Sequence, residues 1–350
     1  MRDLRTMNLF AKRNDLKLAY VGKLDIKLKT NNLACFKNMI LKHKDLYHDI
    51  DKWLETKVLP GIKNGERIAY IGLRNGIPIA SAVLKLGNNC KFCHVSIDKE
   101  AQNSHFGEII FSMMTIDANR NADNLYFTLP RSLWETKKQF FQSFGFEDAS
   151  MSRKQYRHDE EELFCSAPFE KVWGHILEKL PKIINLIVDS QENIFNGLLL
   201  SIKPIYMDMI LKGEKTVEIR RKFNSKWVNR KLILYSSSPV AALMGYASID
   251  SVIEDTPEHI WNKFAKFIGG TRQEYMNYAK DAGKVYAIVL KEVSPFIDRI
   301  TLDQIGKLLR SEIKPPQSYL SLENNSDWAN AVSIAELLHR RMVINTGYME

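Results

Sequence analysis

The pattern of strands and helices in this chain begins twice, and this feature limits the chain to two separately folded domains. The first series ends near residue 157. An acidic run from Asp159 to Glu162 follows, then a helical stretch at 168–185 that Pro181 is expected to kink or interrupt. A second series begins at Gly197. With 350 residues, the chain exceeds the size at which a single core stops growing. We therefore predict an N-terminal domain at 1–160, a helical connector at 161–196, a second domain at 197–322 and a C-terminal helix at 323–350.

Composition excludes several classes of protein. The aromatic content of 10% is too high for a disordered chain, and no run approaches the ~20 apolar residues of a membrane span. The N-terminus lacks the apolar segment of a secretory signal, so we expect a cytoplasmic protein without a membrane partner. The net charge of +9 favours anionic partners such as nucleic acid, nucleotides or coenzyme A. A Lys- and Asn-rich chain from an AT-rich genome would carry the same charge without such a partner.

The four cysteines, Cys35, Cys90, Cys93 and Cys165, are too sparse for a disulfide framework. Cys90, Cys93 and His94 form the sequence C-x-x-C-H, which is the spacing of c-type haem attachment and of half a zinc site. Residues three apart on a strand point to opposite faces, and no second C-x-x-C completes a ligand set. We therefore expect reduced, structural cysteines and no metal.

The N-terminal series predicts an α+β unit. The expected strands are 17–29, three between 65 and 98, 124–130 and one near 150–157. The expected helices are 33–43, 48–59 (ended by Pro60-Gly61), 107–121 and 131–144 (ended by Gly145).

Two segments of this unit resemble the GNAT N-acetyltransferase superfamily, over roughly 15–158. They are VSIDKEAQNSHFGEIIFSMM, between an expected strand and helix, and KKQFFQSFGFEDAS. The resemblance implies a mixed sheet flanked by helices, and a loop of the form [QR]-x-x-G-x-[GA] that wraps the pyrophosphate of acetyl-CoA. Backbone N–H groups and the N-terminus of the next helix supply the attraction in such a loop. The implied cofactor-binding residues are Val95, Gln102, Asn103, Ser104, His105, Phe106 and Gly107.

Two signature positions depart from the superfamily pattern. His105 stands where the first glycine belongs, and its Cβ would oppose the positive φ that the loop needs. Phe141 stands where a tyrosine often protonates the leaving thiolate, and a phenyl ring cannot act as an acid. Asp98 and Glu100 lie where the superfamily deprotonates the acceptor amine, so they are the candidate catalytic bases, and His94 is another option. The alternative is that Asp98 and Glu100 are solvated loop acids and that His94 is a residue of the strand face.

The C-terminal series predicts a second, strand-rich unit. The expected strands are LLLSIKP, KTVEIRRK, KLILYSSS, MGYASIDSVI and KVYAIVLKEV, with a helix at IYMDMILKG, a helical insertion at 257–281 and a terminal docking helix at 327–341. The extended segment 314–319, which contains Pro315 and Pro316, is expected to pack back on this unit.

The segment from Gly213 to Arg220 carries the sharper motif, G-x-K-x-x-E-x-R. On a strand, Thr216, Glu218 and Arg220 share one face, while the residues between them face the core. A carboxylate there accepts from an exocyclic amine, and Lys and Arg hold phosphate or carbonyl oxygens.

With its flanks, this motif resembles the ASCH domain of the PUA-like superfamily, over roughly 197–300. The resemblance implies a PUA-like β-barrel with helical insertions, so the expected fold class is α+β with two domains. It also implies a cleft for RNA, a nucleotide or a modified base, lined by Lys215, Thr216, Glu218, Arg220, Tyr235, Ser236 and Ser237. Arg221, Lys222, Lys226, Arg230 and Lys231 would form a basic surface around it, with Trp227 for stacking. The alternative is that Glu218 and Arg220 form an exposed cross-strand pair.

Three functions follow from these patterns. The first is an acetyl-CoA-dependent N-acetyltransferase whose ASCH-like unit binds RNA or a nucleotide-like substrate. The second is a non-catalytic regulator with a degenerate acetyltransferase unit. The third is hydrolysis of RNA or a nucleoside around Lys215, although Glu218 stands where related N4-acetylcytidine amidohydrolases carry a threonine nucleophile.

Overall fold

The computed structural model describes residues 16–21, 30–47, 49–74, 77–102, 105–119, 122–157, 159–187 and 196–347. These residues form two compact units. The N-terminal unit is Lys12–Ile187 with Glu336–Glu350, and the C-terminal unit is Val188–Ala335. Asn103, Ser104 and the second half of the strand expected at 17–29 lie outside the described residues.

The N-terminal unit is built on a seven-stranded sheet with the order β1-β2-β3-β4-β5-β7-β6. Its strands are β1 (Leu16–Val21), β2 (Arg67–Arg74), β3 (Ile77–Lys85), β4 (Asn89–Ile97), β5 (Asn124–Pro130), β6 (Ala149–Met151) and β7 (Glu162–Pro168). All neighbours are antiparallel except β4 and β5, which helix α5 (Phe106–Ala118) connects as a parallel pair. The expected mixed sheet is confirmed.

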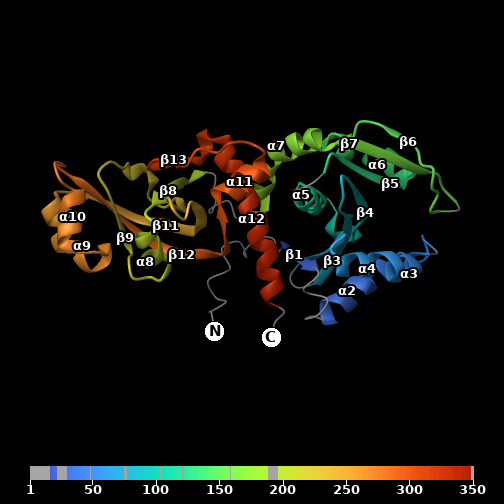
Figure 1. Cartoon of the computed structure of the whole chain (residues 1–350), viewed down its shortest axis with the longest axis horizontal. Helices are drawn as coiled ribbons and strands as arrows, with labels where there is room; N and C mark the ends of the chain where they lie inside the picture. The colour runs from blue at the N-terminus through green and yellow to red at the C-terminus, as the bar shows by residue number, and fades with distance from the viewer. Residues whose placement is uncertain are drawn as a thin grey trace. The chain divides into compact units, whose positions relative to one another are not determined.

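The two faces of this sheet carry different helices. Figure 1 shows α2 (Thr30–Leu41), α3 (Ile50–Trp53) and α4 (Leu59–Lys63) grouped beside β3, apart from α5, α6 (Arg131–Gln142) and α7 (Phe169–Ile187). On the α5 side, the Phe111 ring contacts the rings of Phe92 and Phe144 at centroid distances of 4.6 and 4.8 Å. On the other side, the Arg67 side chain lies against Gly61 of α4.

Three expectations for this unit need correction. The helix expected to stop at Pro60-Gly61 continues to Lys63, after the π-helical turn η2 (Leu54–Val58), because proline in the first turn of α4 needs no N–H partner. The connector expected to be helical at 161–196 begins with strand β7, in which buried and exposed side chains alternate. The acidic run before β7 resembles an exposed linker, so the sequence did not predict this strand. Pro181 does not interrupt α7, because Leu180, Ile183 and Ile184 hold it in the core.

β4 and β5 separate soon after they meet. They pair at three positions, Asn89 with Asn124, Cys90 with Leu125 and Lys91 with Tyr126. Both strands continue beyond this point, β4 to Ile97 and β5 to Pro130, without further pairing. β5 then takes β7 as its antiparallel neighbour along its whole length. The sheet therefore opens between the second halves of β4 and β5, next to the start of α5.

The C-terminal unit contains a six-stranded sheet with the order β13-β8-β10-β11-β12-β9. Its strands are β8 (Leu198–Ile202), β9 (Val217–Arg220), β10 (Lys231–Ser236), β11 (Ala242–Asp255), β12 (Val285–Thr301) and β13 (Tyr319–Ser321). The long strands β11 and β12 pair through three irregularities in register, which bend the sheet. β8 and β10 are parallel because α8 (Pro204–Leu211) begins the connection between them.

Helices cover this sheet on the outside. α9 (Pro257–Ile268) and α10 (Arg272–Tyr278) form the expected insertion and pack on Val217 and Ile219 of β9. α11 (Leu302–Leu309) follows β12, and α12 (Ser326–Gly347) is the terminal helix. The segment after Lys314 packs back on the sheet as expected, because β13 pairs with β8. Within the described residues, no helix is both long and apolar enough to cross a bilayer.

Candidate functional sites

The motif of β9 forms a buried ionic cluster. The Glu218 carboxylate lies 3.3 Å from Lys215 Nζ through Oε2 and 2.9 Å from Arg220 Nη2 through Oε1. Lys215 is 3% exposed and Glu218 is 6% exposed. The alternative of an exposed Glu218–Arg220 pair is therefore wrong, because the strand turns these side chains inward.

Lys215 is held by the backbone as well as by Glu218. Its ammonium donates to the carbonyl oxygens of Val217 at 2.7 Å and Ile268 at 2.5 Å. The Tyr206 ring of α8 lies 5.3 Å from the same nitrogen. Burial lowers the pKa of Lys215, and the nearby Glu218 carboxylate opposes that change. The lysine is thus fixed between α8, β9 and the end of α9.

Arg220 reaches from β9 to the opposite side of the sheet. Its Nη2 donates to the carbonyl oxygen of Ser201 in β8 at 2.5 Å. Its Nε is buried and has no hydrogen-bond partner in the described part of the chain, and the same holds for Ser236 Oγ. Ser201 pairs with Tyr235, the residue before Ser236, so the two unpartnered groups belong to one end of the sheet. Buried polar atoms without partners usually indicate a ligand or water site.

The remaining residues expected in this cleft are placed differently. Tyr235 and Ser236 point to opposite faces of β10, so they cannot line one cleft. The Tyr235 ring packs edge-on against Trp328 of α12, with centroids 5.5 Å apart. Ser237 donates through its backbone N–H to Ile202 O at 2.8 Å. Thr216 is half-buried and donates through its backbone N–H to Phe267 O at 3.0 Å.

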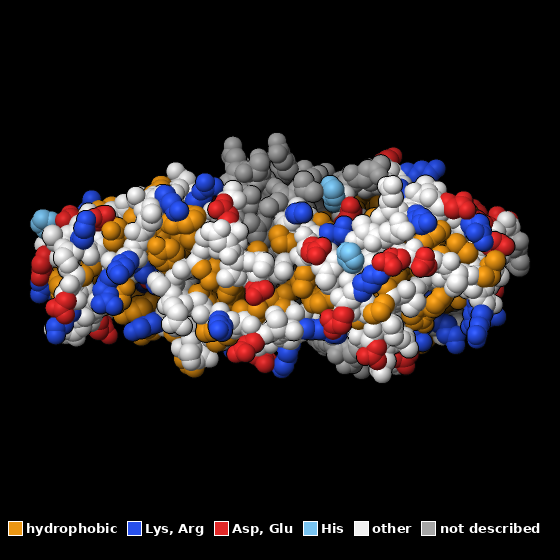
Figure 2. Space-filling model, turned by 90° about the horizontal axis from the view of Figure 1, so that it is seen from above, with side chains coloured by type: hydrophobic (Ala, Val, Ile, Leu, Met, Phe, Trp, Pro, Cys, Tyr) orange, Lys and Arg blue, Asp and Glu red, His pale blue; other side chains and the backbone are white. Residues whose placement is uncertain are grey.

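The expected basic surface is only partly present. Arg221, Lys222, Lys226 and Arg230 are exposed, and in Figure 2 Lys and Arg side chains are interspersed with hydrophobic atoms over the C-terminal unit. Lys231, however, is buried and lies 3.6 Å from the Glu292 carboxylate. Trp227 packs against the core, and the Lys226 ammonium lies 4.7 Å from the centroid of its ring. The ring is therefore not free to stack on a base.

In the N-terminal unit, the expected cofactor loop lies where β4 and β5 separate. His105 has φ 60° and caps the start of α5, so the histidine adopts the left-handed conformation that we expected its Cβ to oppose. Histidine is among the residues that tolerate this region best after glycine. Val95 is 41% exposed, and the Gln102 amide donates to Ile97 O at 3.3 Å.

Phe106 and Gly107 begin α5 directly after this turn. Phe106 is 1% exposed and fills the space above Gly72, where an added Cβ would lie 2.3 Å from its ring. Phe106 therefore anchors the helix in the core and does not face a ligand. Gly107 is half-buried beside the Phe140 ring.

The candidate bases differ in environment. Glu100 is exposed, and Asp98 lies 3.4 Å from Lys42 Nζ of the turn after α2. Sequence analysis missed His43, whose Nε2 lies 2.6 Å from Ser96 Oγ, in the half of β4 that pairs with β3 but not with β5. Burial lowers the pKa of His43, so its imidazole is neutral at pH 7 and can accept a proton. No spacing in the sequence indicated that the end of α2 would reach β4.

The expected acid position is apolar. The Phe141 ring lies 4.9 Å from Phe127 and 5.9 Å from Trp134, so it is part of the core beside β5. A proton for a leaving thiolate would have to come from solvent or from another group.

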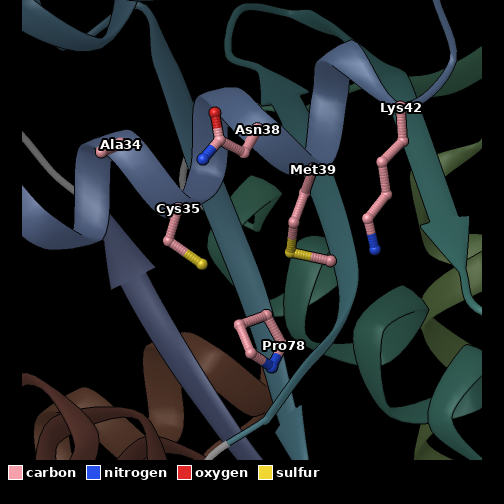
Figure 3. A pocket seen from close by; sticks show the side chains of 6 residues that line it. All are labelled: Ala34, Cys35, Asn38, Met39, Lys42 and Pro78. Atoms are coloured by element: carbon pink, nitrogen blue, oxygen red, sulfur yellow. The ribbon is translucent and has the colours of Figure 1, made fainter.

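A groove of about 490 Å³ lies between α2 and the beginning of β3. Figure 3 shows its lining side chains, Ala34, Cys35, Asn38, Met39, Lys42 and Pro78. Lys42 is also the partner of Asp98, so the groove leads toward the end of β4. Burial raises the pKa of the Cys35 thiol, which disfavours a reactive thiolate in the groove.

The C-x-x-C-H segment lies on β4 without a ligand geometry. Cys90 is buried and donates to Gly87 O at 3.1 Å, while burial raises the pKa of Cys93. Among the described residues, no group of three or more His, Cys, Asp or Glu side chains is arranged to hold a metal ion.

These features describe two α+β units: a seven-stranded mixed sheet flanked by helices, and a bent six-stranded sheet with a helical insertion. Residues 196–307 match the family model described as a domain of unknown function, DUF365. The chain is also 29% identical over 119 residues to a curated ASCH domain-containing ribonuclease from Zymomonas mobilis subsp. mobilis. That match covers 34% of this chain and 79% of the relative.

Solved structures resemble the two halves of the chain separately. The crystal structure of ASCH from Zymomonas mobilis is 26% identical, with a TM-score of 0.36, and the match covers 40% of this chain and 96% of that one. An acetyltransferase from Thermus thermophilus is 18% identical, with a TM-score of 0.32, over 44% of this chain and 96% of its own. The ASCH resemblance predicted from the sequence is confirmed by the curated relative. Acetyltransferases, one of them of the GNAT family, are among the solved structures to which the chain is similar.

Proposed function

We propose that this protein is an acetyl-CoA-dependent N-acetyltransferase whose C-terminal unit binds RNA or a nucleotide-like ligand. The observation that carries the proposal is the separation of β4 from β5 after three paired positions. Backbone groups on the facing edges of the two strands are then available to an extended ligand. His105 at positive φ starts α5 at the same place, and a helix N-terminus attracts phosphate.

The chain offers groups for the chemistry of acetyl transfer. The acceptor nitrogen would attack the thioester carbonyl, the carbon–sulfur bond would break, and the ammonium proton would pass to a base. His43, next to Ser96 on the half of β4 that has no β5 partner, and Asp98 at the end of β4 are the candidate bases. Glu100, two residues further and exposed, is the weaker candidate. Val95, Gln102, Asn103, Ser104, His105 and Gly107 remain the proposed cofactor-contacting residues, Asn103 and Ser104 on the basis of sequence alone.

The C-terminal unit is proposed to bind RNA or a nucleotide through the end of the sheet that holds Arg220. The unpartnered Arg220 Nε and Ser236 Oγ support this proposal, as do the exposed cations Arg221 and Lys222. A curated relative of this unit is named a ribonuclease, which makes RNA the first ligand to test.

Titration of the full chain with acetyl-CoA by calorimetry tests the acetyltransferase proposal. We expect binding in the micromolar to millimolar range, with loss in Gly107→Trp, whose side chain would fill the start of α5. The control is Gly283→Trp, in the C-terminal unit, where the space around the glycine is open. Absence of binding at millimolar acetyl-CoA would reject the proposal and favour the non-catalytic regulator.

The second candidate function is hydrolysis of RNA at Lys215. The observation that favours it is a buried lysine with a lowered pKa beside the Glu218 carboxylate, since perturbed groups often mark catalytic sites. Incubation of RNA with wild type and with Lys215→Met tests it. RNA that stays intact with both proteins would eliminate hydrolysis and leave binding as the role of this cluster.

A further inference from the structure

We propose that the N-terminal unit has its own binding surface for single-stranded RNA, on the sheet face that carries Arg67, Lys85, Lys91, Tyr126, Phe164 and Tyr156. We call these residues the sheet platform. The proposal goes beyond the RNA site of the C-terminal unit and does not depend on acetyl transfer. It rests on three observations: a row of cations, a group of exposed rings, and their place next to the opening between β4 and β5.

Three cations form a row across neighbouring strands. Arg67 pairs with Lys85 between β2 and β3, and Lys85 pairs with Lys91 between β3 and β4. Directly paired residues project from the same face of a sheet, and like charges in this arrangement are destabilising. Within the part of the chain that the structure describes, none of the three forms an ion pair with a carboxylate. An anion that covers this row would relieve the repulsion between its cations.

The row ends in aromatic side chains. Lys91 pairs with Tyr126 of β5, and its ammonium lies 5.9 Å from the centroid of that ring and 5.2 Å from the centroid of Tyr156. The Tyr126 and Phe164 rings lie 5.6 Å apart. Phe164 is 37% exposed and Tyr156 is 44% exposed, so both rings have faces open to solvent. Exposed rings next to lysines suit a base stacked on a ring with its phosphates on the cations.

Single-stranded RNA fits this arrangement better than a duplex or a small anion. A duplex keeps its bases stacked on each other and offers no free base to Tyr126 or Phe164. A small anion would satisfy the cations and leave the rings uncovered. The Lys91–Tyr126 pair is also the last pair before β4 and β5 separate, so a base stacked on Tyr126 would lie at the start of that opening.

Two other ionisable side chains, Cys93 and Glu162, lie near this row of cations. Cys93 lies near Arg67, Lys85 and Lys91, but burial raises the pKa of its thiol. Glu162 of β7 is 1% exposed, its pKa is raised by burial, and its Oε1 has no hydrogen-bond partner among the described residues.

Fluorescence anisotropy with a labelled 12-nucleotide unstructured RNA tests the proposal on the full chain. We expect Lys85→Gln/Lys91→Gln to weaken binding at least tenfold. The slope of log affinity against log salt should fall by about 1.4, since each phosphate contact on a single strand contributes about 0.7. Tyr126→Leu should weaken binding about tenfold with the salt slope unchanged. Lys63→Gln/Lys138→Gln, which removes two lysines of the same unit outside the platform, is the matched control and should change affinity less than twofold.

Three outcomes would overturn the proposal. The first is RNA affinity within twofold of wild type in both platform variants, with Arg221→Gln/Lys222→Gln as the only variant that weakens binding; this would leave the RNA site of the C-terminal unit intact. The second is displacement of RNA by acetyl-CoA together with loss of acetyl-CoA binding in Lys85→Gln/Lys91→Gln, which would assign the row to the cofactor. The third is no RNA binding by wild type, which would reject both RNA sites and leave the acetyl-CoA titration unaffected. Thermal unfolding of each variant shows whether it is folded.

Discussion

Arg220 of β9 donates to the backbone carbonyl oxygen of Ser201 in β8, although β9 is an edge strand and β10, β11 and β12 lie between the two in the sheet. The arginine therefore joins the two sides of a bent sheet that backbone pairing leaves open. Glu218 positions the arginine from the same strand, and Lys215 holds Glu218 from the other side. The cluster is thus structural as well as a candidate ligand site.

Loss of the Glu218 charge should destabilise the C-terminal unit. In Glu218→Gln the side chain keeps its shape, but Lys215 and Arg220 become buried cations without a counter-charge. Breaking a buried ion pair in this way typically costs about 3 kcal/mol or more. We expect a lower midpoint for one calorimetric transition of the full chain. Glu214→Gln, exposed in the same segment, should leave that midpoint unchanged, and equal midpoints for the two variants would contradict the structural role.

Gly72 and Gly174 should respond oppositely to alanine. A Cβ at Gly72 would lie 2.3 Å from the Phe106 ring and 2.9 Å from the Ala80 Cβ, so Gly72→Ala should cost about 1–3 kcal/mol. A Cβ at Gly174, inside α7, has no atom within 4 Å, so Gly174→Ala should stabilise the helix by about 0.5–1 kcal/mol. Urea denaturation followed by circular dichroism measures both effects. Stabilisation by Gly72→Ala would show that Phe106 does not occupy this space.

His105→Gly should stabilise the N-terminal unit and keep acetyl-CoA binding, because the contact proposed for residue 105 is made by the backbone at the start of α5, which glycine retains. A residue with a Cβ costs roughly 1–2 kcal/mol in the left-handed region, while glycine costs about 0.5–1 kcal/mol in chain entropy. The net gain should therefore be about 0.5–1 kcal/mol at φ 60°. His105→Val should be destabilising, because β-branched residues are strained at positive φ. Thermal unfolding with and without acetyl-CoA measures both effects. If acetyl-CoA no longer stabilises His105→Gly, the imidazole takes part in binding.

The stability of the N-terminal unit should depend on His94 at acid pH. Burial, assisted by the nearby His43, lowers the pKa of His94 to about 3, while the unfolded value is about 6.5. Between these values the unfolded chain binds a proton that the folded chain does not. The contribution of His94 is therefore complete above pH 6.5 and falls as the pH decreases toward 3, by at most about 1.4 kcal/mol per pH unit. Chemical denaturation of His94→Gln from about pH 4 to 7 should show a flatter dependence than wild type, whereas exposed His259→Gln should follow wild type.

Much of the order of elements could be read from the sequence, because each strand and helix has its own periodicity. The alternation in β2, β3 and β4 and the helical spacing in α5 and α6 predicted elements that the structure contains. β7 was missed because the acidic residues before it matched an exposed linker, and its pairing with β5 is a contact between distant segments. The short strand β6 was expected to be longer, since its residues resemble a strand but only three of them pair.

The candidate sites show the same division. The G-x-K-x-x-E-x-R spacing indicated which residues of β9 act together, and the structure brings Lys215, Glu218 and Arg220 together. The spacing of this motif did not indicate that Lys215 and Glu218 are buried, because their burial depends on β8 and on the insertion helices. His43 next to Ser96 was not expected, since the two residues are 53 positions apart.

The sequence alone determined that this protein has two units, which local patterns form strands and helices, and which short motifs carry charge. These properties depend on interactions between residues close in the chain. Only the tertiary structure decided that β4 and β5 separate and that Arg67, Lys85 and Lys91 form one row. Those relationships depend on strand register and on packing between distant segments, and no local pattern encodes them.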